Sequence, residues 1–344
     1  MPCYVPGEQP QDQKYIKLNT NESPYPPSPE VIAAINQEAV ANLRLYCDPE
    51  CKVLKQKLAD RYGFSPENIY LSNGSDDILA FAFMAYASDG APVAFPDITY
   101  GFYSVFAALY GSDIRVIPLK ENFTVDPKEY CGINRTVFIA NPNAPTGLAL
   151  SLSAVEEIVR SNPAHVIVVD EAYVDFGAES CIELVRRYDN LLVVRTFSKS
   201  RALAGARLGF AIASPAIIED LNRIKYATNP YNVNRLTQLA GAAAIDSDAY
   251  FIENCHRIAQ TRRMTEEKLV KLGFTVIPSL ANFIFARHNS LSGETVYREL
   301  KKRGILIRHF HASRIADFNR ITVGSEEEME TFITVLSEVI TKLT

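Results

Sequence analysis

Short runs of almost purely apolar, β-branched residues recur along the first two thirds of this chain, and helical patterns separate them. The clearest runs are APVAF (91–95), HVIVVDEA (165–172) and LLVVRTFS (191–198). Apolar residues at nearly every position, rather than at alternate positions, indicate strands that are buried on both faces. Such strands alternating with helices predict an α/β fold in which a mostly parallel sheet lies between helices.

Seven segments carry the strand pattern, and the last third of the chain has a different rhythm. The strands are expected at 68–72, 91–95, 113–119, 135–142, 165–172, 191–198 and 209–214. After residue 215 a long helical stretch leads into FTVIPS, ANFIFAR, a helix through ETVYRELKKRG, then ILIRHF and RITVG, which is typical of a small α+β domain. We therefore expect an N-terminal arm at 1–29 that joins the small domain, a large domain at 30–240, and a small domain at 241–344.

Length, charge and cysteine pattern exclude several classes of protein. A chain of 344 residues is long enough for two domains. Its net charge of -5 provides no basic field for nucleic acid, and no apolar segment approaches the roughly 20 residues of a membrane span. The six cysteines contain no CxxC pair and the N-terminus has no signal-peptide pattern, so we expect a cytoplasmic protein with reduced thiols.

Polar residues follow four of the predicted strands, at the edge where ligands bind in open parallel sheets. After strand 68–72, Ser75 and Asp76 open a helix, and the backbone N–H groups at such a helix start can bind an anion. After strand 135–142, Asn143 lies in the rigid turn NPNAPTG, where its amide can meet a ligand hydroxyl. A simple helix cap and a simple turn are the alternative explanations at these two places.

A carboxylate and a lysine end the two most apolar strands. Asp170 follows a run of Val and Ile, where a carboxylate is costly unless it is paired, for example with a protonated ring nitrogen. Tyr173 follows closely and can bind a second ring substituent, although Asp170 could instead cap a helix from Glu171 onward. Lys199 lies just past the strand that ends at Ser198, and loss of hydration favours the neutral amine that a Schiff-base lysine requires.

One further cation completes the pattern. Arg207 lies in the small-residue segment AGARLG, and together with Ser198 it can clamp a phosphate. A phosphate site, an amide, an aspartate, a tyrosine, a lysine and an arginine thus occur in this order, distributed over the ends of separate strands. The joint pattern is far more specific than any of its parts.

The residues resemble those of the fold-type I pyridoxal 5'-phosphate (PLP) enzymes, in particular the histidinol-phosphate aminotransferase family. The resemblance runs from about Leu18 to Gly324. Its blocks, in that family's order, are NTNESPYPPSP, SNGSDD, PDITYGFY, NPNAPTG, VVDEAYVDF, RTFSKSRALAGARLGF, ANFIFAR and RITVG. It implies a large PLP-binding domain with a small domain beside it, and PLP held by Lys199 as a Schiff base.

The resemblance also assigns roles to the other residues. Lys199 would move a proton between substrate and cofactor, and Asp170 would pair with the pyridine nitrogen. The remaining cofactor contacts would be Tyr173 and Asn143 at the ring oxygen, Tyr100 on the ring face, and Ser75, Asp76, Thr196, Ser198 and Arg207 around the phosphate. Tyr46 would reach the cofactor phosphate of the neighbouring subunit, which implies a homodimer with shared active sites.

Tyr25, Arg308 and Arg320 match the positions that bind the anionic end of the substrate. Both arginines also allow an interpretation as surface charges, since each borders an apolar strand. His309 and His311 form an HxH pair, but no further ligand is evident, so we expect no metal site. Three residues depart from the family's usual pattern: Ala144 stands where Asn is frequent, Cys47 replaces a frequent Pro, and Pro26 replaces a frequent Gly.

The implied reaction is transfer of an amino group between L-histidinol phosphate and 2-oxoglutarate, with imidazole acetol phosphate and L-glutamate on the other side, in histidine biosynthesis. An aromatic amino acid aminotransferase and a threonine-phosphate decarboxylase remain alternatives, because the motifs around Lys199 do not separate them. A regulatory protein that keeps this fold without turnover would be supported by a DNA-binding segment, and none is evident. A nucleotide-binding protein would be expected to carry GxGxxG or GxxxxGK[ST], and neither appears.

Overall fold

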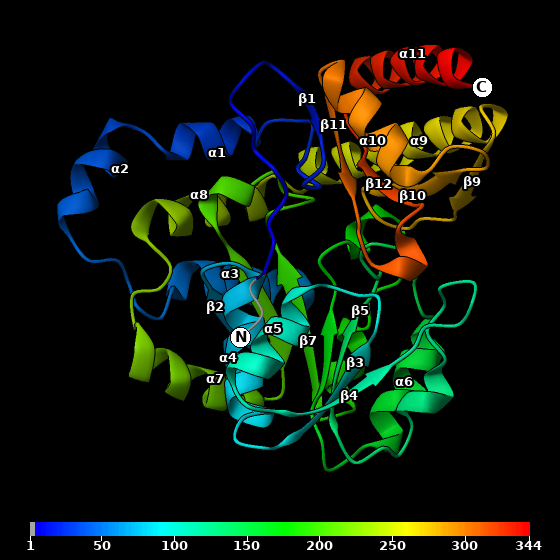
Figure 1. Ribbon diagram of the computed structural model, residues 1–344. Coiled ribbons are helices and arrows are strands. Elements are labelled where there is room, and N and C mark those ends of the chain that lie inside the picture. Colours follow the sequence, from blue (N-terminus) through cyan, green and yellow to red (C-terminus); the bar gives the residue numbers. More distant parts are fainter. Residues whose placement is uncertain (1–3) are drawn as a thin grey trace.

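Two β-sheets organise the molecule, and the computed structural model describes residues 4–344 (Figure 1). The larger sheet has the strand order β2-β8-β7-β6-β5-β3-β4. Its strands are β2 (Ile69–Ser72), β3 (Pro92–Pro96), β4 (Asp113–Ile117), β5 (Thr136–Ala140), β6 (Ile167–Asp170), β7 (Leu191–Thr196) and β8 (Gly209–Ala213). Only β8 runs antiparallel to its neighbours, β2 and β7. The expected α/β fold with a mostly parallel seven-stranded sheet is confirmed.

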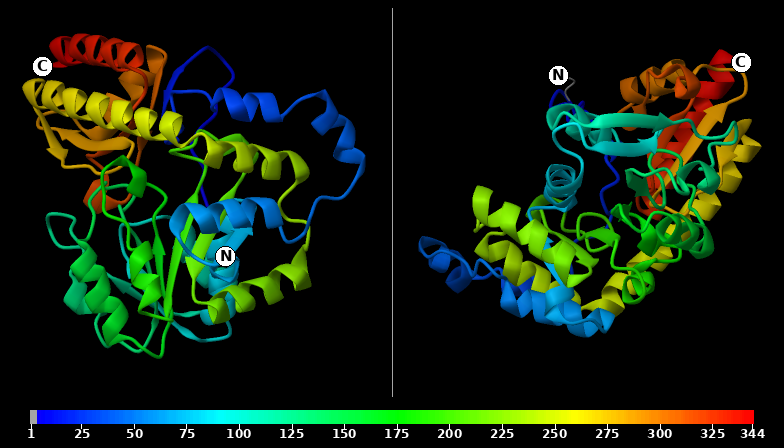
Figure 2. Two further views of the ribbon diagram at one scale, coloured as in Figure 1. Left: turned by 180° about the vertical axis from the view of Figure 1, so that it is seen from behind. Right: turned by 90° about the horizontal axis from the view of Figure 1, so that it is seen from below.

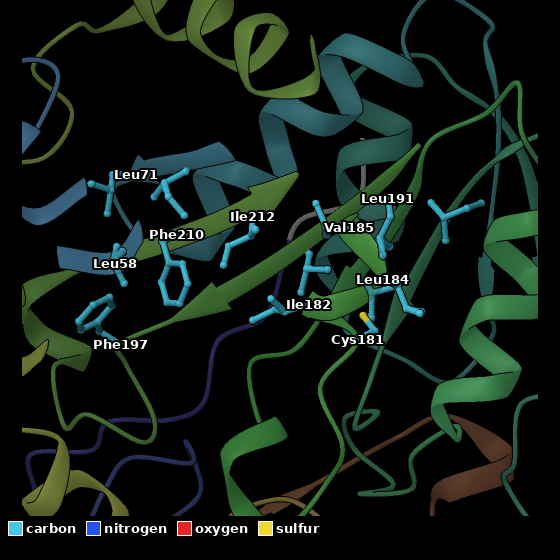
Figure 3. Close-up of a cluster of buried hydrophobic side chains, with 14 of the residues drawn as sticks. Leu58, Leu71, Cys181, Ile182, Leu184, Val185, Leu191, Phe197, Phe210 and Ile212 are labelled. Atoms are coloured by element: carbon cyan, nitrogen blue, oxygen red, sulfur yellow. The ribbon is translucent and has the colours of Figure 1, made fainter. Parts of the chain in front are cut away.

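Helices cover both faces of the larger sheet. One face packs against α3 (Lys52–Tyr62), α6 (Leu152–Ser161) and α8 (Arg235–Asp246), and the other against α4 (Ser75–Tyr86), α5 (Phe102–Leu109) and α7 (Pro215–Thr228). Successive strand residues alternate between the two cores: Val169 and Val193 belong to the first, and Val168 and Val194 to the second. Figure 3 shows part of the first core, with Phe197, Phe210 and Ile212 among the labelled side chains. This two-sided burial explains the continuous apolar runs of the sequence.

The smaller sheet has the strand order β1-β11-β12-β10-β9. Its strands are β1 (Ile16–Leu18), β9 (Phe274–Ile277), β10 (Phe283–His288), β11 (Ile305–His309) and β12 (Asn319–Thr322), and the helices of this region are α9 (Asp248–Lys271), α10 (Gly293–Lys302) and α11 (Glu326–Leu343). The arm contributes β1, which pairs in parallel with β11 and places Ile16 opposite Ile305. A strand of three residues is too short for a readable period, so the sequence did not reveal it. The domain limits at 29/30 and 240/241 stay a prediction.

The apolar spacing from Val31 to Asn42 is typical of one continuous helix, but the structure interrupts this segment. It consists of α1 (Pro29–Ala34), α2 (Gln37–Ala41) and a 3-10 turn (Asn42–Arg44). Asn36 causes the break, since its side chain accepts a hydrogen bond from the Ala39 backbone N–H at 3.0 Å and so starts a new helix. This segment projects from the rest of the molecule (Figures 1 and 2). Further short 3-10 turns lie at Pro66–Asn68, Pro127–Tyr130, Val174–Phe176, Ile182–Arg186, Ala204–Ala206 and Ser313–Ile315.

None of the helices within residues 4–344 combines the length and the apolar character that crossing a bilayer would require.

Candidate active site

A cavity of about 870 Å³ lies beyond the carboxyl ends of β6 and β7, where the arm and the smaller sheet supply further walls. The predicted site residues that line it are Ser75, Asp76, Tyr100, Asp170, Tyr173, Thr196, Ser198, Lys199, Arg207, Arg308 and Arg320. The residues of the larger sheet are far apart in the sequence but meet here because its parallel strands end at the same edge. Arg308 and Arg320 come instead from β11 and β12 of the smaller sheet. This cavity is the candidate active site.

Asp170 is a buried carboxylate at the end of β6, with an exposed fraction of 5%. Its Oδ1 accepts a hydrogen bond from the Ala172 backbone N–H at 3.1 Å, and its Oδ2 accepts one from the Tyr103 hydroxyl at 3.3 Å. Burial, with a smaller contribution from the negative charge of Asp76, raises the pKa of Asp170 to about 7. Among residues 4–344 the ion pairs do not include Asp170, so a protonated ring nitrogen would find an unpaired acceptor.

Lys199 lies three residues beyond the end of β7 and opens into the cavity. Its Nζ donates a hydrogen bond to the backbone carbonyl of Thr20, in the arm, at 3.1 Å. Burial, followed by the positive charge of Arg320, lowers the pKa of Lys199 to about 8. A substantial fraction of the amine is therefore neutral near physiological pH, which is the form that attacks a carbonyl.

The start of α4 forms an anion site at the other end of the cavity. Ser75 and Asp76 begin this twelve-residue helix, and its first backbone N–H groups are available to an anion. Arg207 donates from Nη2 to Asp76 Oδ2 at 3.0 Å, and the Tyr100 hydroxyl donates to Asp76 Oδ1 at 2.7 Å. The carboxylate of Asp76 thus holds a guanidinium and a phenol at the rim of the anion site.

Strand β8 approaches the helix start so closely that only glycine fits. A Cβ on Gly209 would lie 2.4 Å from the backbone nitrogen of Ser75. On the neighbouring strand end, the Thr196 hydroxyl donates to Ser198 Oγ at 2.9 Å, so two more hydroxyls border the same end of the cavity. The helix N-terminus, the hydroxyls and Arg207 together fit a phosphate group.

Asn143 does not belong to the cavity lining. Its amide donates to the carbonyl of Ile98 at 2.9 Å and to the Thr146 hydroxyl at 3.1 Å, and its Oδ1 accepts from Thr99 at 2.8 Å. The neighbouring Ala144 lines the cavity instead. The expected contact between Asn143 and the ring oxygen therefore does not fit this geometry, because the turn uses the amide to hold itself together.

Two more predicted residues lie away from the cavity of their own chain. Tyr25 packs beneath Arg257, whose guanidinium carbon lies 4.2 Å from the ring centroid. Tyr46 has an exposed fraction of 79%, and its ring stacks on Tyr231 at 4.5 Å. The assignment of Tyr46 to a neighbouring subunit stays a prediction.

The arm supplies groups that the sequence did not reveal. Arg308 donates to the carbonyls of Val5 and Pro6 at 2.9 Å each, and Arg320 donates from Nη2 to the carbonyl of Asn19 at 2.9 Å. The Nε of Arg320 is buried and has no hydrogen-bond partner within residues 4–344. Neither arginine is a simple surface charge, and Arg320 keeps a free donor beside Lys199.

Tyr103 was also missed, although a signal existed. It lies in the same block, PDITYGFY, three residues after Tyr100, and the two rings meet edge to face with their centroids 5.9 Å apart. The arm contacts had no such signal, because backbone carbonyls such as that of Thr20 carry no side-chain identity.

These residues fit PLP. Asp170 is an unpaired buried acceptor for the ring nitrogen, Lys199 is a weakly basic amine for the aldehyde, and the start of α4 with Arg207 suits the phosphate. The tight contact at Gly209 keeps the backbone of the phosphate site in place. Fold and site together define a PLP-dependent transferase of fold type I.

Comparison with known proteins gives the family. Residues 13–336 match the model of the family "Aminotransferase class I and II". A histidinol-phosphate aminotransferase of Brachyspira hyodysenteriae is 49% identical over 331 residues, which are 96% of this chain and 94% of the relative. One of Clostridium acetobutylicum is 48% identical over 337 residues, 98% of this chain and 96% of the relative.

A solved structure agrees with these sequences. The histidinol-phosphate aminotransferase of Sinorhizobium meliloti, in complex with pyridoxal-5'-phosphate, superposes with a TM-score of 0.89 at 27% identity, over 96% of this chain and 93% of that one. The chain therefore belongs to the aminotransferase class I and II family, and within it to the histidinol-phosphate aminotransferases. Its cofactor is PLP.

Lys199→Ala removes the amine that we expect to carry the cofactor. We predict that borohydride treatment of the variant with PLP leaves no covalently bound cofactor, whereas the wild-type protein is labelled at one site per chain. Mass spectrometry of the reduced, digested proteins measures this. Lys225→Ala, which removes a lysine outside the cavity, should be labelled like the wild type, and labelling of Lys199→Ala would mean that another lysine is used.

The raised pKa of Asp170 predicts a pH dependence of stability for the cofactor-free protein. Between about pH 4 and pH 7 the folded state holds a proton that the unfolded state has lost, so this residue lowers stability as pH rises through that window. Asp170→Asn removes this titrating group. We therefore expect the free energy of unfolding of the variant, relative to that of the wild type, to increase from pH 4.5 to pH 7.5. Urea unfolding at the two pH values measures it, with Asp60→Asn on the exposed surface of α3 as the control.

Proposed function

We propose that this enzyme transfers the amino group between L-histidinol phosphate and 2-oxoglutarate, in histidine biosynthesis. The observation that carries the proposal is the unpartnered Nε of Arg320, buried beside Lys199 in the same cavity. A cation in this place binds the anionic end of a substrate whose amino group reaches Lys199. Near-half identity to histidinol-phosphate aminotransferases over nearly the full chain supports a phosphate as that anionic end.

The residues divide the chemistry between them. PLP supplies an aldehyde that links to amines and a ring that accepts the electron pair of the substrate carbon. Asp170 holds the ring nitrogen in its protonated form, because a buried carboxylate is stabilised by a positive charge next to it. Lys199 would hold the aldehyde of the cofactor, and its free amine would take a proton from the substrate carbon and return one on the other side of the transfer.

The arginines and the arm set the position of the substrate. Arg320 is oriented by the carbonyl of Asn19, and Arg308 by the carbonyls of Val5 and Pro6. Both substrates carry an anion, a phosphate in one and a carboxylate in the other, so the same guanidinium groups can serve both half-reactions. The arm also lines the cavity, where it would limit the access of water to the reacting carbon.

A single-turnover experiment tests the proposal. We expect histidinol phosphate to convert the PLP form of the enzyme to the pyridoxamine form much faster than histidinol, phenylalanine or O-phosphothreonine. The loss of absorbance of the lysine-bound cofactor measures each rate. Preference for phenylalanine would identify an aromatic aminotransferase, and release of CO2 from O-phosphothreonine would identify a decarboxylase.

Arg320→Ala separates phosphate recognition from general binding. We predict that it raises KM for histidinol phosphate by about 10- to 150-fold, since a buried charge-assisted contact contributes roughly 1.5–3 kcal/mol. KM for histidinol, which has no phosphate, should change far less. Steady-state kinetics with both amines measures the difference, and an equal effect on the two would remove Arg320 from phosphate binding.

We further propose that two copies share their active sites. Large apolar side chains are exposed on the projecting segment, at Ile32, Ile35, Val40, Leu43, Leu45 and Tyr46. Several exposed apolar side chains on one short segment support burial against a second copy. Tyr46 would then leave its exposed position and reach the phosphate site of the partner.

Mixed dimers test the sharing of sites. In a hybrid of Lys199→Ala and Tyr46→Ala subunits, one site carries both substitutions and the other carries neither. We predict that unfolding and refolding the two weakly active proteins together raises activity above the sum of the separate activities, up to about a quarter of the wild-type level. Activity equal to that sum, with dimers confirmed by light scattering, would show that Tyr46 serves its own subunit or none.

The cytoplasm is the compartment that we propose. Cys47, Cys51, Cys131, Cys181 and Cys255 are all free thiols in the part of the chain that the structure describes. Free thiols are typical of a reducing compartment.

A further inference from the structure

A chain of buried hydrogen bonds connects the smaller sheet to the cavity through the arm. Asn21, with an exposed fraction of 1%, lies at its centre in the left-handed conformation, at φ 57°. Its backbone N–H donates to Thr322 Oγ1 at 2.9 Å, and its carbonyl accepts from Asn282 at 3.0 Å. Its side-chain amide donates to the Tyr173 hydroxyl at 2.9 Å. Three hydrogen-bond partners therefore hold Asn21 in place, and one of them, Tyr173, lines the cavity.

The network sets the direction of each hydrogen bond. Thr322 accepts from the Asn21 backbone, so its own proton is free to donate, and it donates to Asn21 Oδ1 at 3.1 Å. The amide nitrogen of Asn21 must then face Tyr173, and the Tyr173 oxygen must accept. The phenolic proton of Tyr173 is left over, and no acceptor for it exists within residues 4–344. Tyr173 thus keeps its O–H for a ligand in the cavity.

The other wall near Tyr173 offers no donor of this kind. Ala144 lines the cavity and packs in the same apolar cluster as Tyr173, and it presents only a methyl group. The amide of Asn143 is used by Ile98 and Thr146. A ring oxygen bound at this place therefore depends on the Tyr173 hydroxyl alone among these three side chains.

We propose that Asn21 is a positioning residue for the cofactor: it fixes the Tyr173 hydroxyl as a donor to the cofactor's ring oxygen, at a place where Ala144 supplies no amide. A hydrogen bond from the Tyr173 hydroxyl stabilises the anionic form of the ring oxygen. The ring oxygen then holds less tightly the proton that it shares with the nitrogen of the lysine link. Asn21 thereby lowers the pH at which the lysine-bound cofactor loses that proton. The inference rests on PLP binding at Lys199 and not on the identity of the amino donor.

The experiment is a pH titration of the absorbance of the lysine-bound cofactor, without substrate. Tyr173→Phe removes the donor, and we expect it to raise the midpoint by about one pH unit or more. Asn21→Ala should raise it in the same direction, and the double variant should match Tyr173→Phe alone, because Asn21 acts only through Tyr173. Asn21→Asp keeps the side-chain size but replaces the amide donor with a carboxylate acceptor. Tyr173 should then donate its proton to this carboxylate, and the midpoint should also lie above that of the wild type.

Several outcomes would overturn the proposal. A wild-type midpoint in Asn21→Ala would do so, as would additive shifts in the double variant or an unshifted midpoint in Tyr173→Phe. Ser23→Ala is the matched control, because it changes the same arm outside the cavity and should leave the midpoint unchanged. If Asn21→Ala unfolds, Asn21→Asp decides in its place. Failure of the wild-type protein to form the absorbing link at all would instead remove the proposed function.

Discussion

The parallel pairing of β5, β6 and β7 is the constraint on which the site depends. In this register Ala140 lies opposite Asp170, and Asp170 opposite Val194, so three successive strands end at one edge. Apolar cores fill both faces of the sheet, and the polar groups can only stand beyond that edge. The same burial then acts on an acid and on a base in opposite directions. It raises the pKa of Asp170 and lowers that of Lys199, and both groups approach neutrality within a single cavity.

The larger sheet could be predicted well because its signals are local. Each strand is a short apolar run whose composition follows from two-sided burial, and each polar strand end directly follows such a run. Asp170, Lys199 and the start of α4 were therefore found from the residues themselves, and the cavity brings them together. The arginines of the smaller sheet were predicted from the resemblance to the family. The residues alone did not distinguish a substrate contact from a surface charge at these positions.

The arm and the turn after β5 could not be predicted, because their contacts are either made by backbone atoms or depend on the exact turn conformation. Backbone carbonyls of the arm accept hydrogen bonds from Lys199, Arg308 and Arg320, and every residue type carries such a carbonyl. The sequence could not decide which of Asn143 and Ala144 faces the cavity, since a turn of seven residues fits either arrangement. The broken helix at Asn36 belongs to the same group, because an asparagine within a helical pattern can cap or simply be tolerated.

The pairing of β1 with β11 has a consequence for the order in which the molecule is assembled during synthesis. Ile16 finds its partner only when Ile305 has been made, so the arm has no sheet to join until nearly the whole chain has left the ribosome. The larger sheet, with Asp170 and Lys199 at its edge, is complete in sequence about a hundred residues earlier. A nascent chain, or one truncated before β11, would therefore lack the arm wall of the cavity and expose these two groups to water.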